Sequence, residues 1–219
     1  MKKTTINFDQ FYNALISGNK ELCSAIISAF LSKNTDISTL YEHLFKPSLY
    51  KVGYEWEQQR LNVAVEHMAT SIVEDLMNEL LPGMVSLQRK GRNVVLSSVE
   101  NEEHQLGCRM VADTFEKHGW DTFFTGAKTP ITDLITFCET IKPHLICLSL
   151  SITSNMPVLL HEIKTIRNHT DVTILIGGQG LIESGKVISE HFNNVVYLKD
   201  VFEVEELITE TENDNSKRG

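Results

Sequence analysis

A histidine preceded by a carboxylate is the first feature of the sequence that could do chemistry. The segment 100–107 reads Glu-Asn-Glu-Glu-His-Gln-Leu-Gly and places His104 two residues after Glu102. A neutral imidazole nitrogen is a good donor to a transition metal. A carboxylate that accepts a hydrogen bond from the other ring nitrogen fixes the tautomer and makes the donor nitrogen more basic. We therefore predict that His104 binds a metal and that Glu102 orients it.

Small residues at two later places in the chain could admit a large ligand. Ser149 and Ser151 lie at the end of one β-rich run, and Gly177 and Gly178 lie at the end of another. Residues with little or no side chain let a ligand approach the backbone closely, although a glycine-rich turn before a helix also suits a phosphate group. Together with His104, these positions describe a metal-bearing cofactor with a long tail.

Short β-rich runs alternate with helix-length segments in the second part of the chain. The runs are 94–99, 122–124, 145–150, 172–176 and 195–197. This alternation is typical of a doubly wound parallel sheet with right-handed crossovers. Such sheets bind ligands at the carboxyl ends of the strands, where the strand order reverses. Because the histidine, the serines and the glycines all follow strands, we expect the sheet to bring them to one edge.

The first part of the chain shows helical periodicity only. Apolar residues recur at helical spacing from about residue 8 to residue 87, with breaks at 17–19 and 82–83. We expect four helices, the third beginning after Asp36 with a bend or interruption at Pro47, and the fourth beginning near Asn62. Four helices of this length form a bundle.

The sequence therefore predicts an α/β protein with two domains. Residues 1–88 form a four-helix bundle, and residues 92–210 form a flavodoxin-like, that is Rossmann-like, doubly wound domain with five parallel strands. The segment 87–91 is the expected linker. Residues 211–219 lack apolar side chains and are expected to be a disordered tail.

Composition narrows the class of protein. The formal net charge of the 219 residues is −9 and Lys and Arg form no dense cluster, so we expect no direct binding to DNA or RNA. The longest apolar runs fall far short of the roughly 18 to 20 residues that span a bilayer, and the start of the chain does not resemble a signal peptide. We therefore expect a cytoplasmic protein without a membrane partner.

The four cysteines are scattered, which argues against a disulfide framework or a zinc site.

The second part of the chain resembles the cobalamin-binding domain family, whose signature is Asp-x-His-x-x-Gly followed by Ser-x-Leu and Gly-Gly. Here Glu102-x-His104-x-x-Gly107 is followed, at the family spacing, by Ser149 and by the glycine pair at 177–178. Glu102 stands where Asp is commoner, as in a light-sensing branch of the family, and Ser151 stands where Leu is usual. The resemblance implies that His104 displaces the cofactor's own dimethylbenzimidazole base from cobalt. It also implies that the nucleotide tail runs beside the serine and glycine motifs.

The first part of the chain resembles the helical bundle of adenosylcobalamin-dependent photoreceptors, known from MerR-type light-responsive regulators. Trp56 lies ten positions before Glu66, which His67 follows. The resemblance implies that the bundle caps the upper face of the corrin and that Trp56, Val63, Glu66 and His67 surround the 5′-deoxyadenosyl group. Glu57 stands where some photoreceptors have a histidine that can bind cobalt after photolysis. We expect no DNA-binding domain like theirs.

These features favour a cobalamin-binding sensor over an enzyme. We expect light sensing through adenosylcobalamin, with output through a protein partner or self-association. The alternative is a corrinoid methyl carrier that binds methylcobalamin and serves a methyltransferase system, and a haem-binding relative of the sensor fold is a third possibility. With His104 on cobalt, the residues expected to contact the cofactor are Trp56, Val63, Glu66, His67, Glu102, Gly107, Ser149, Ser151, Thr153, Gly177, Gly178 and Gln179.

Overall fold

The computed structural model describes residues 8–32 and 36–216 and divides into two units, Met1–Gly83 and Met84–Gly219. The division falls directly after Pro82-Gly83, where the helical pattern of the sequence stops, and just before the expected linker. Within the described ranges, no helix has both the length and the apolar character that crossing a bilayer requires.

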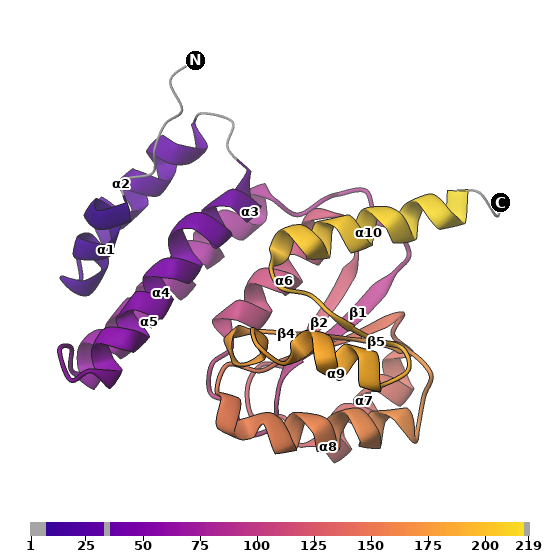
Figure 1. Ribbon diagram of the computed structural model, residues 1–219. Helices are drawn as coiled ribbons and strands as arrows, with labels where there is room; N and C mark the ends of the chain where they lie inside the picture. Colours follow the sequence, from indigo (N-terminus) through magenta and orange to yellow (C-terminus); the bar gives the residue numbers. More distant parts are fainter. Residues whose placement is uncertain (1–7, 33–35, 217–219) are drawn as a thin grey trace. The chain divides into compact units, whose positions relative to one another are not determined.

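The first unit contains helices joined by turns, and no strand, in its described residues. Its helices are α1 (Phe8–Ile16), α2 (Lys20–Leu31), α3 (Ile37–Leu40), α4 (Lys46–Glu57) and α5 (Val63–Leu80). A π-helical turn, Tyr41–Phe45, joins α3 to α4, so that these segments make up the third predicted helix. Figure 1 shows α4 and α5 side by side. The predicted four-helix bundle is therefore confirmed.

The helix ends that flank Trp56 and Val63 follow from the sequence. The interruption expected at Pro47 is the π-helical turn directly before α4. Pro47 lies in the first turn of α4 and has no N–H to donate to the preceding helical turn, which agrees with the irregular, π-helical hydrogen bonding directly before it. Asn62 caps α5, because its Oδ1 accepts a hydrogen bond from the Val65 amide at 3.0 Å.

The second unit is a parallel sheet with helices between its strands. The strands are β1 (Asn93–Ser98), β2 (Asp121–Phe124), β3 (Leu145–Ser149), β4 (Thr173–Gly177) and β5 (Val195–Tyr197). All pairs are parallel and the order is β2-β1-β3-β4-β5. The helices are α6 (Leu106–Lys117), α7 (Ile131–Ile141), α8 (Met156–Arg167), α9 (Gly185–His191) and α10 (Val201–Ser216). This order is that of the flavodoxin-like fold, as predicted.

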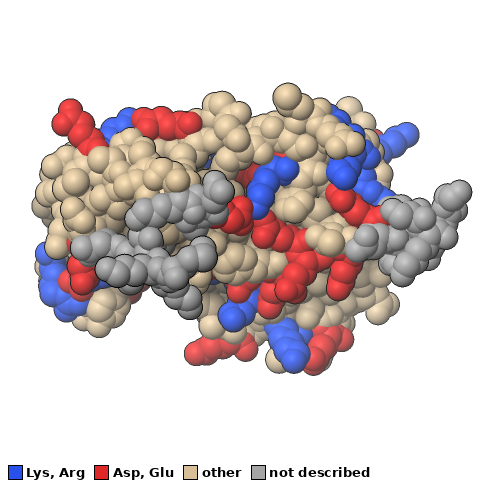
Figure 2. Space-filling view, turned by 90° about the horizontal axis from the view of Figure 1, so that it is seen from above, with Lys and Arg blue, Asp and Glu red and all other residues tan. Residues whose placement is uncertain are grey.

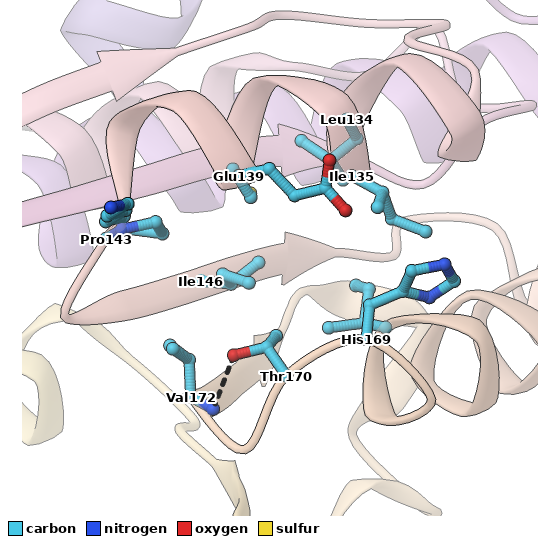
Figure 3. Close-up of a pocket in the computed structure, with 11 residues that line it drawn as sticks. Leu134, Ile135, Glu139, Pro143, Ile146, His169, Thr170 and Val172 are labelled. Atoms are coloured by element: carbon cyan, nitrogen blue, oxygen red, sulfur yellow. Dashed lines mark hydrogen bonds between the residues drawn. The ribbon is translucent and has the colours of Figure 1, made fainter.

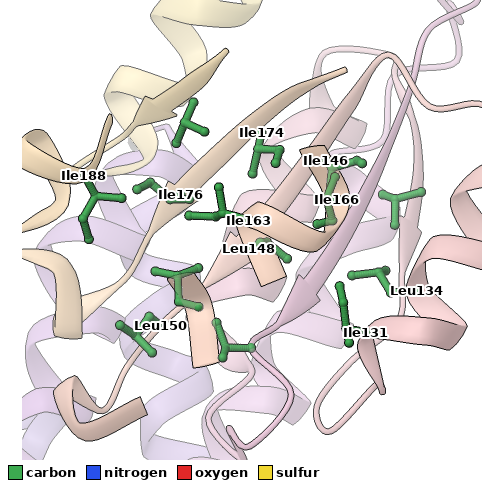
Figure 4. Packing of buried hydrophobic residues seen from close by; sticks show 14 of the residues in the cluster. Ile131, Leu134, Ile146, Leu148, Leu150, Ile163, Ile166, Ile174, Ile176 and Ile188 are labelled. Atoms are coloured by element: carbon green, nitrogen blue, oxygen red, sulfur yellow. The ribbon is translucent and has the colours of Figure 1, made fainter. Parts of the chain in front are cut away.

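Two apolar cores enclose the sheet. Helices α7, α8 and α9 cover one face, where Ile146, Ile163 and Ile174 belong to the larger cluster (Figure 4). Helices α6 and α10 cover the other face, where Phe115 and Ile208 belong to the smaller one. Strands buried on both faces explain why the β-rich runs of the sequence are almost continuously apolar. The cysteines are buried too, and burial raises the pKa of Cys108 to about 12 and of Cys138 to about 11.

The C-terminal segment differs from its prediction. The sequence predicts a disordered tail from residue 211, but α10 continues to Ser216. The helix extends from a part that is held in the core by Val204 and Ile208. The Thr211 hydroxyl donates to the Leu207 carbonyl at 2.7 Å, and Glu212 lies 3.2 Å from the Lys90 ammonium. The prediction of disorder is thus wrong for residues 211–216, and residues 217–219 lie outside the described ranges.

Candidate functional site

The segments that follow β1, β3 and β4 leave the sheet at the same edge. In the parallel register Ser98 pairs with Ser149, and Ser149 pairs with Gly177. Strand β1 lies between β2 and β3, so the strand order reverses beside it. Doubly wound sheets bind their ligands at this point. The sheet therefore brings the predicted serine, glycine and histidine segments to one edge.

The carboxylate of Glu102 joins two of these segments and is fully buried. Its Oε2 lies 3.3 Å from His104 Nδ1, the contact predicted from the spacing of the two residues. Its Oε1 accepts hydrogen bonds from the Ser151 amide at 3.2 Å, the Ile152 amide at 2.9 Å and Asn155 Nδ2 at 3.1 Å. Glu102 thus ties the loop that carries His104 to the segment after β3.

The protonation of this pair follows from the same contacts. Burial alone would raise the pKa of Glu102, but the hydrogen bonds from His104, the Ile152 amide and Asn155 outweigh it and leave the pKa below its usual value. An ionised carboxylate only accepts hydrogen bonds, so the favoured tautomer of His104 carries its proton on Nδ1. Nε2, on the other side of the ring, then has the lone pair that can bind a metal. The His104 side chain is 54% exposed and can reach a ligand.

Asn155 is a residue of this site that the sequence analysis missed. It ends the 3₁₀ turn Thr153–Asn155, which follows β3. Its amide supplies the side-chain donor to Glu102 Oε1, beside two backbone donors. A polar residue in the segment after a central strand is the signal that could have identified it.

The glycines of the predicted cofactor slot differ in whether the fold leaves space for a side chain at their position. A Cβ at Gly107 would meet no atom within 4 Å, so open space lies beside the first turn of α6. A Cβ at Gly178 would lie 2.3 Å from the Leu150 carbonyl oxygen, and Gly178 has a φ of +111°. A Cβ at Gly177 would lie 3.0 Å from the Leu198 carbonyl oxygen. The fold itself therefore requires Gly178, whereas Gly107 leaves room for a ligand.

A pair of alanine substitutions tests this difference. We expect Gly178→Ala to lower the free energy of unfolding by about 3 kcal/mol, because it adds a clash with backbone to a strained φ. Gly107→Ala should change it by less than about 1 kcal/mol, since a helical position with open space accepts a methyl group. Denaturant unfolding of both variants measures the difference. Equal effects would contradict this account of Gly178.

The other predicted tail contacts lie in the short turns after β3 and β4. Ser149 is buried at the end of β3, and Ser151 follows it half-buried. Thr153 and Gln179 begin two 3₁₀ turns, Thr153–Asn155 and Gln179–Leu181, and both residues are exposed. The two turns contact each other. The structure therefore places these four residues along one edge of the sheet.

The predicted upper-face residues gather where α4 ends and α5 begins. Trp56 lies in the last turn of α4 and is 45% exposed, and Val63 begins α5 and is 49% exposed. Glu66 accepts a hydrogen bond from the Thr70 hydroxyl at 3.1 Å, and its Oε2 lies 3.6 Å from His67 Nε2. Trp56 and Val63 are exposed apolar side chains on either side of the turn 58–62, and an apolar ligand could pack against them.

Both units match models of known families. Residues 92–197 match a B12 binding domain, and residues 8–81 match a second B12 binding domain model. The chain belongs to the B12-binding domain family. Cobalamin is therefore its cofactor, as the motifs around His104 predict.

A transcriptional repressor and a corrinoid protein are similar in sequence to the chain. It is 23% identical over 155 residues to the HTH-type transcriptional repressor CarA of Myxococcus xanthus, covering 70% of the chain and 51% of that protein. It is 22% identical over 172 residues to trimethylamine corrinoid protein 1 of Methanosarcina acetivorans, covering 76% of the chain and 80% of that protein. The chain thus spans about half the length of the repressor.

A solved structure has the same fold. The monomethylamine corrinoid protein of Methanosarcina barkeri superposes with a TM-score of 0.78 at 15% identity, covering 93% of the chain and 97% of that protein. At this identity the match supports the fold alone. The fold of this B12-binding protein is therefore that of a corrinoid protein.

The residues at the sheet edge fit a B12 cofactor. Cobalt accepts an imidazole nitrogen, and the buried Glu102 carboxylate holds His104 with Nε2 on the side away from it. The open space beside Gly107, three residues after His104, leaves room for a bulky group. The donor type, its carboxylate partner and the free volume all suit a corrin that takes one ligand from the protein.

A cavity of the B12-binding unit lies elsewhere. A hollow of about 310 Å³ between α7 and the segment after α8 is lined by Ile146 and Val172, near the amino ends of β3 and β4 (Figure 3). That is the opposite edge of the sheet from His104.

On the face seen in Figure 2, acidic and basic side chains are intermixed and form no broad basic patch.

Proposed function

We propose that this B12-binding protein senses light through adenosylcobalamin, with His104 as the lower axial ligand to cobalt. Adenosylcobalamin supplies a cobalt–carbon bond that light can break. Glu102 keeps Nδ1 of His104 protonated and so directs Nε2 to the metal. The nucleotide tail is proposed to lie along the residues that follow β1, β3 and β4: Gly107, Ser149, Ser151, Thr153, Gly177, Gly178 and Gln179.

The observation that carries the sensor proposal is the exposed apolar surface at the α4–α5 turn. Trp56 and Val63 are about half exposed there, and Glu66 and His67 lie close by on α5. An indole ring and a valine suit an adenine base, and a carboxylate and an imidazole suit ribose hydroxyls. We propose that these four residues contact the adenosyl group. A methyl group offers neither an adenine base nor ribose hydroxyls for these residues to contact.

The output of such a sensor follows from the same residues. When the adenosyl group is lost, Trp56 and Val63 lose the apolar group against which they are proposed to pack. An exposed tryptophan and valine then favour contact with another protein surface or with a second copy of the chain. We therefore propose that illumination changes self-association or the binding of a protein partner.

Illumination of the loaded protein tests the sensor directly. The protein is loaded with adenosylcobalamin in the dark, and its absorption spectrum and its size in solution are measured before and after green light. We expect both to change. If neither changes, this protein is not a light sensor, although it remains a cobalamin-binding protein.

Substitution of the tryptophan tests the upper-face contact. We expect Trp56→Ala to weaken adenosylcobalamin binding about tenfold and to leave methylcobalamin binding nearly unchanged, because about 1.4 kcal/mol of apolar contact is lost with the indole. The matched control is Tyr54→Ala, which removes another exposed aromatic residue of α4. Titration of each variant with both cobalamins gives the comparison. An equal loss for both would count against an adenosyl contact.

A corrinoid methyl carrier is the second candidate. The observation in its favour is that the chain is 22% identical over 172 residues to trimethylamine corrinoid protein 1, a match that covers 76% of the chain. A carrier must present cobalt to a partner methyltransferase, so a bulky apolar cap would hinder it. Tighter binding of methylcobalamin than of adenosylcobalamin, with no response to light, would favour the carrier.

A further inference from the structure

A serine at the end of β1 is hydrogen-bonded to the backbone of His104. Ser98 is the last residue of that strand, and 1% of its surface is exposed. Its Oγ donates a hydrogen bond of 3.1 Å to the His104 carbonyl oxygen. This bond closes the segment between the two residues, called here the ligand loop (residues 99–104), at the end that carries the imidazole.

The His104 carbonyl lies just outside the hydrogen-bond ladder of α6. The helix begins at Leu106, and Gln105 is its N-cap. The N-cap carbonyl is the first that a helix uses, and the Arg109 amide donates to the Gln105 carbonyl at 2.9 Å. Helical hydrogen bonding therefore does not place the backbone of His104, and the bond from Ser98 does.

The backbone around Ser98 is held by both neighbouring strands or their extensions. The Ser98 amide donates to the Gly126 carbonyl oxygen, after β2, at 3.0 Å. On the other side Ser98 pairs with Ser149 of β3, and the Val99 amide donates to the Ser149 carbonyl oxygen at 3.0 Å. The Ser98 hydroxyl is therefore presented to the ligand loop from a fixed position.

Two other printed contacts of the ligand loop act at different points. At its start, the Glu100 amide donates to Glu162 Oε1 of α8 at 2.7 Å. Near its end, Glu102 Oε2 lies 3.3 Å from Nδ1 of the His104 ring. The contact with Glu102 sets the direction of the ring, but the place from which the ring extends depends on the backbone of His104. The Ser98 hydroxyl acts on that backbone.

We infer that Ser98 is a positioning residue for the lower ligand: its hydroxyl fixes the backbone of His104, while Glu102 fixes the ring. The inference rests on the proposed role of His104 as the lower ligand. A ligand that is already held in place loses less conformational freedom when it binds its partner. Loss of the Ser98 hydroxyl should therefore weaken cobalamin binding and lower the share of bound cofactor whose cobalt is on His104.

The first test compares Ser98→Ala with Ser97→Ala. Ser97 is the matched control because it is also 1% exposed, and its Oγ donates to the Ser98 carbonyl oxygen at 2.9 Å. Both variants lose one buried hydroxyl group, but Ser98→Ala alone loses the bond to His104. In titrations with aquocobalamin we expect Ser98→Ala to bind about fivefold more weakly and Ser97→Ala to stay within about twofold of the wild type. Equal affinities of the two variants would overturn the inference.

The nitrogen on cobalt can be identified by electron spin resonance. The protein is made with histidine that carries the heavy nitrogen isotope, and the bound cobalamin is reduced to its paramagnetic state. A labelled imidazole splits the cobalt signal differently from the unlabelled base of the cofactor. We expect the labelled pattern in the wild type and in Ser97→Ala, and a mixture in Ser98→Ala. Ser98→Thr keeps the hydroxyl and should restore the labelled pattern; a mixture in this variant would contradict a role of the hydroxyl.

A measurement on the cofactor-free protein keeps this inference separate from the proposed function. The carbonyl carbon of His104 should change its NMR frequency in Ser98→Ala, because it loses a hydrogen bond, and should keep it in Ser97→Ala. If His104→Ala binds cobalamin like the wild type, the proposed lower ligand is wrong, but this frequency change remains. If the frequency does not change in Ser98→Ala, Ser98 does not hold His104, whichever group binds cobalt.

Discussion

Replacement of His104 by alanine is expected to weaken cobalamin binding on the order of 100-fold. Removal of a residue that hydrogen-bonds to a metal ligand typically weakens metal binding by about 10- to 100-fold. We expect the upper value because here the ligand itself is removed. The spectrum of the bound cofactor should change with it, since cobalt can then bind only its own base or water. The fold should be preserved, because the His104 side chain is 54% exposed and packs little against the core. Titration and absorption spectra of the loaded variant provide the measurement.

The matched control for this experiment is another exposed histidine of the same unit. His161 lies on α8 with an exposed side chain, and His161→Ala should leave binding and spectrum unchanged. A His104→Ala variant that binds cobalamin with the wild-type affinity and spectrum would exclude His104 as the lower ligand. The tail contacts proposed for the serine and glycine segments would then have to carry the binding alone.

The sheet and its site edge could be predicted because they depend on patterns along the chain. The central strands β1, β3 and β4 are buried on both faces, and such strands need nearly continuous apolar runs, which the sequence contains. The contact between Glu102 and His104 was predictable because both lie on one short loop. The crossover rule for parallel strands then places that loop beside the segment after β3.

Contacts between segments that are distant in sequence could not be predicted in this way. Asn155 reaches Glu102 through the path of an irregular turn, which no periodicity specifies. The need for glycine at 178 arises from the Leu150 carbonyl oxygen, which belongs to another segment. Helix α10 passes residue 211 because its earlier turns are held in the core, although the local composition suggests disorder.

The sequence contains a signal that Glu162 is buried, although this signal is easily overlooked. A glutamate on a helix is usually solvated. Here, however, it stands between Leu159, Ile163 and Ile166, and these spacings place it on the apolar stripe of α8. The pattern could have indicated its burial. Its contact with the Glu100 amide requires the three-dimensional structure.

Replacement of Glu102 by glutamine should block the cobalt–imidazole bond while it leaves the fold largely intact. The carboxylate accepts from His104 on one oxygen and from three donors on the other. An amide has a single acceptor oxygen, and the three donors, two of them backbone amides, will take it. The amide NH₂ then faces His104 Nδ1, which must lose its proton to accept. The proton moves to Nε2, and the ring can no longer offer that nitrogen to cobalt.

The size of the effect separates this tautomer argument from a loss of packing. Glu102→Gln should weaken cobalamin binding by about 10- to 100-fold and lower the free energy of unfolding by only about 1 kcal/mol. Glu102→Ala leaves three donors without an acceptor at a buried position and should cost about 4 kcal/mol. Glu103→Gln is the matched control, because Glu103 is exposed and pairs with Lys128 on the surface. Denaturant unfolding and cobalamin titration of the three variants give both quantities. A Glu102→Gln protein with wild-type affinity would mean that Glu102 does not set the tautomer of His104.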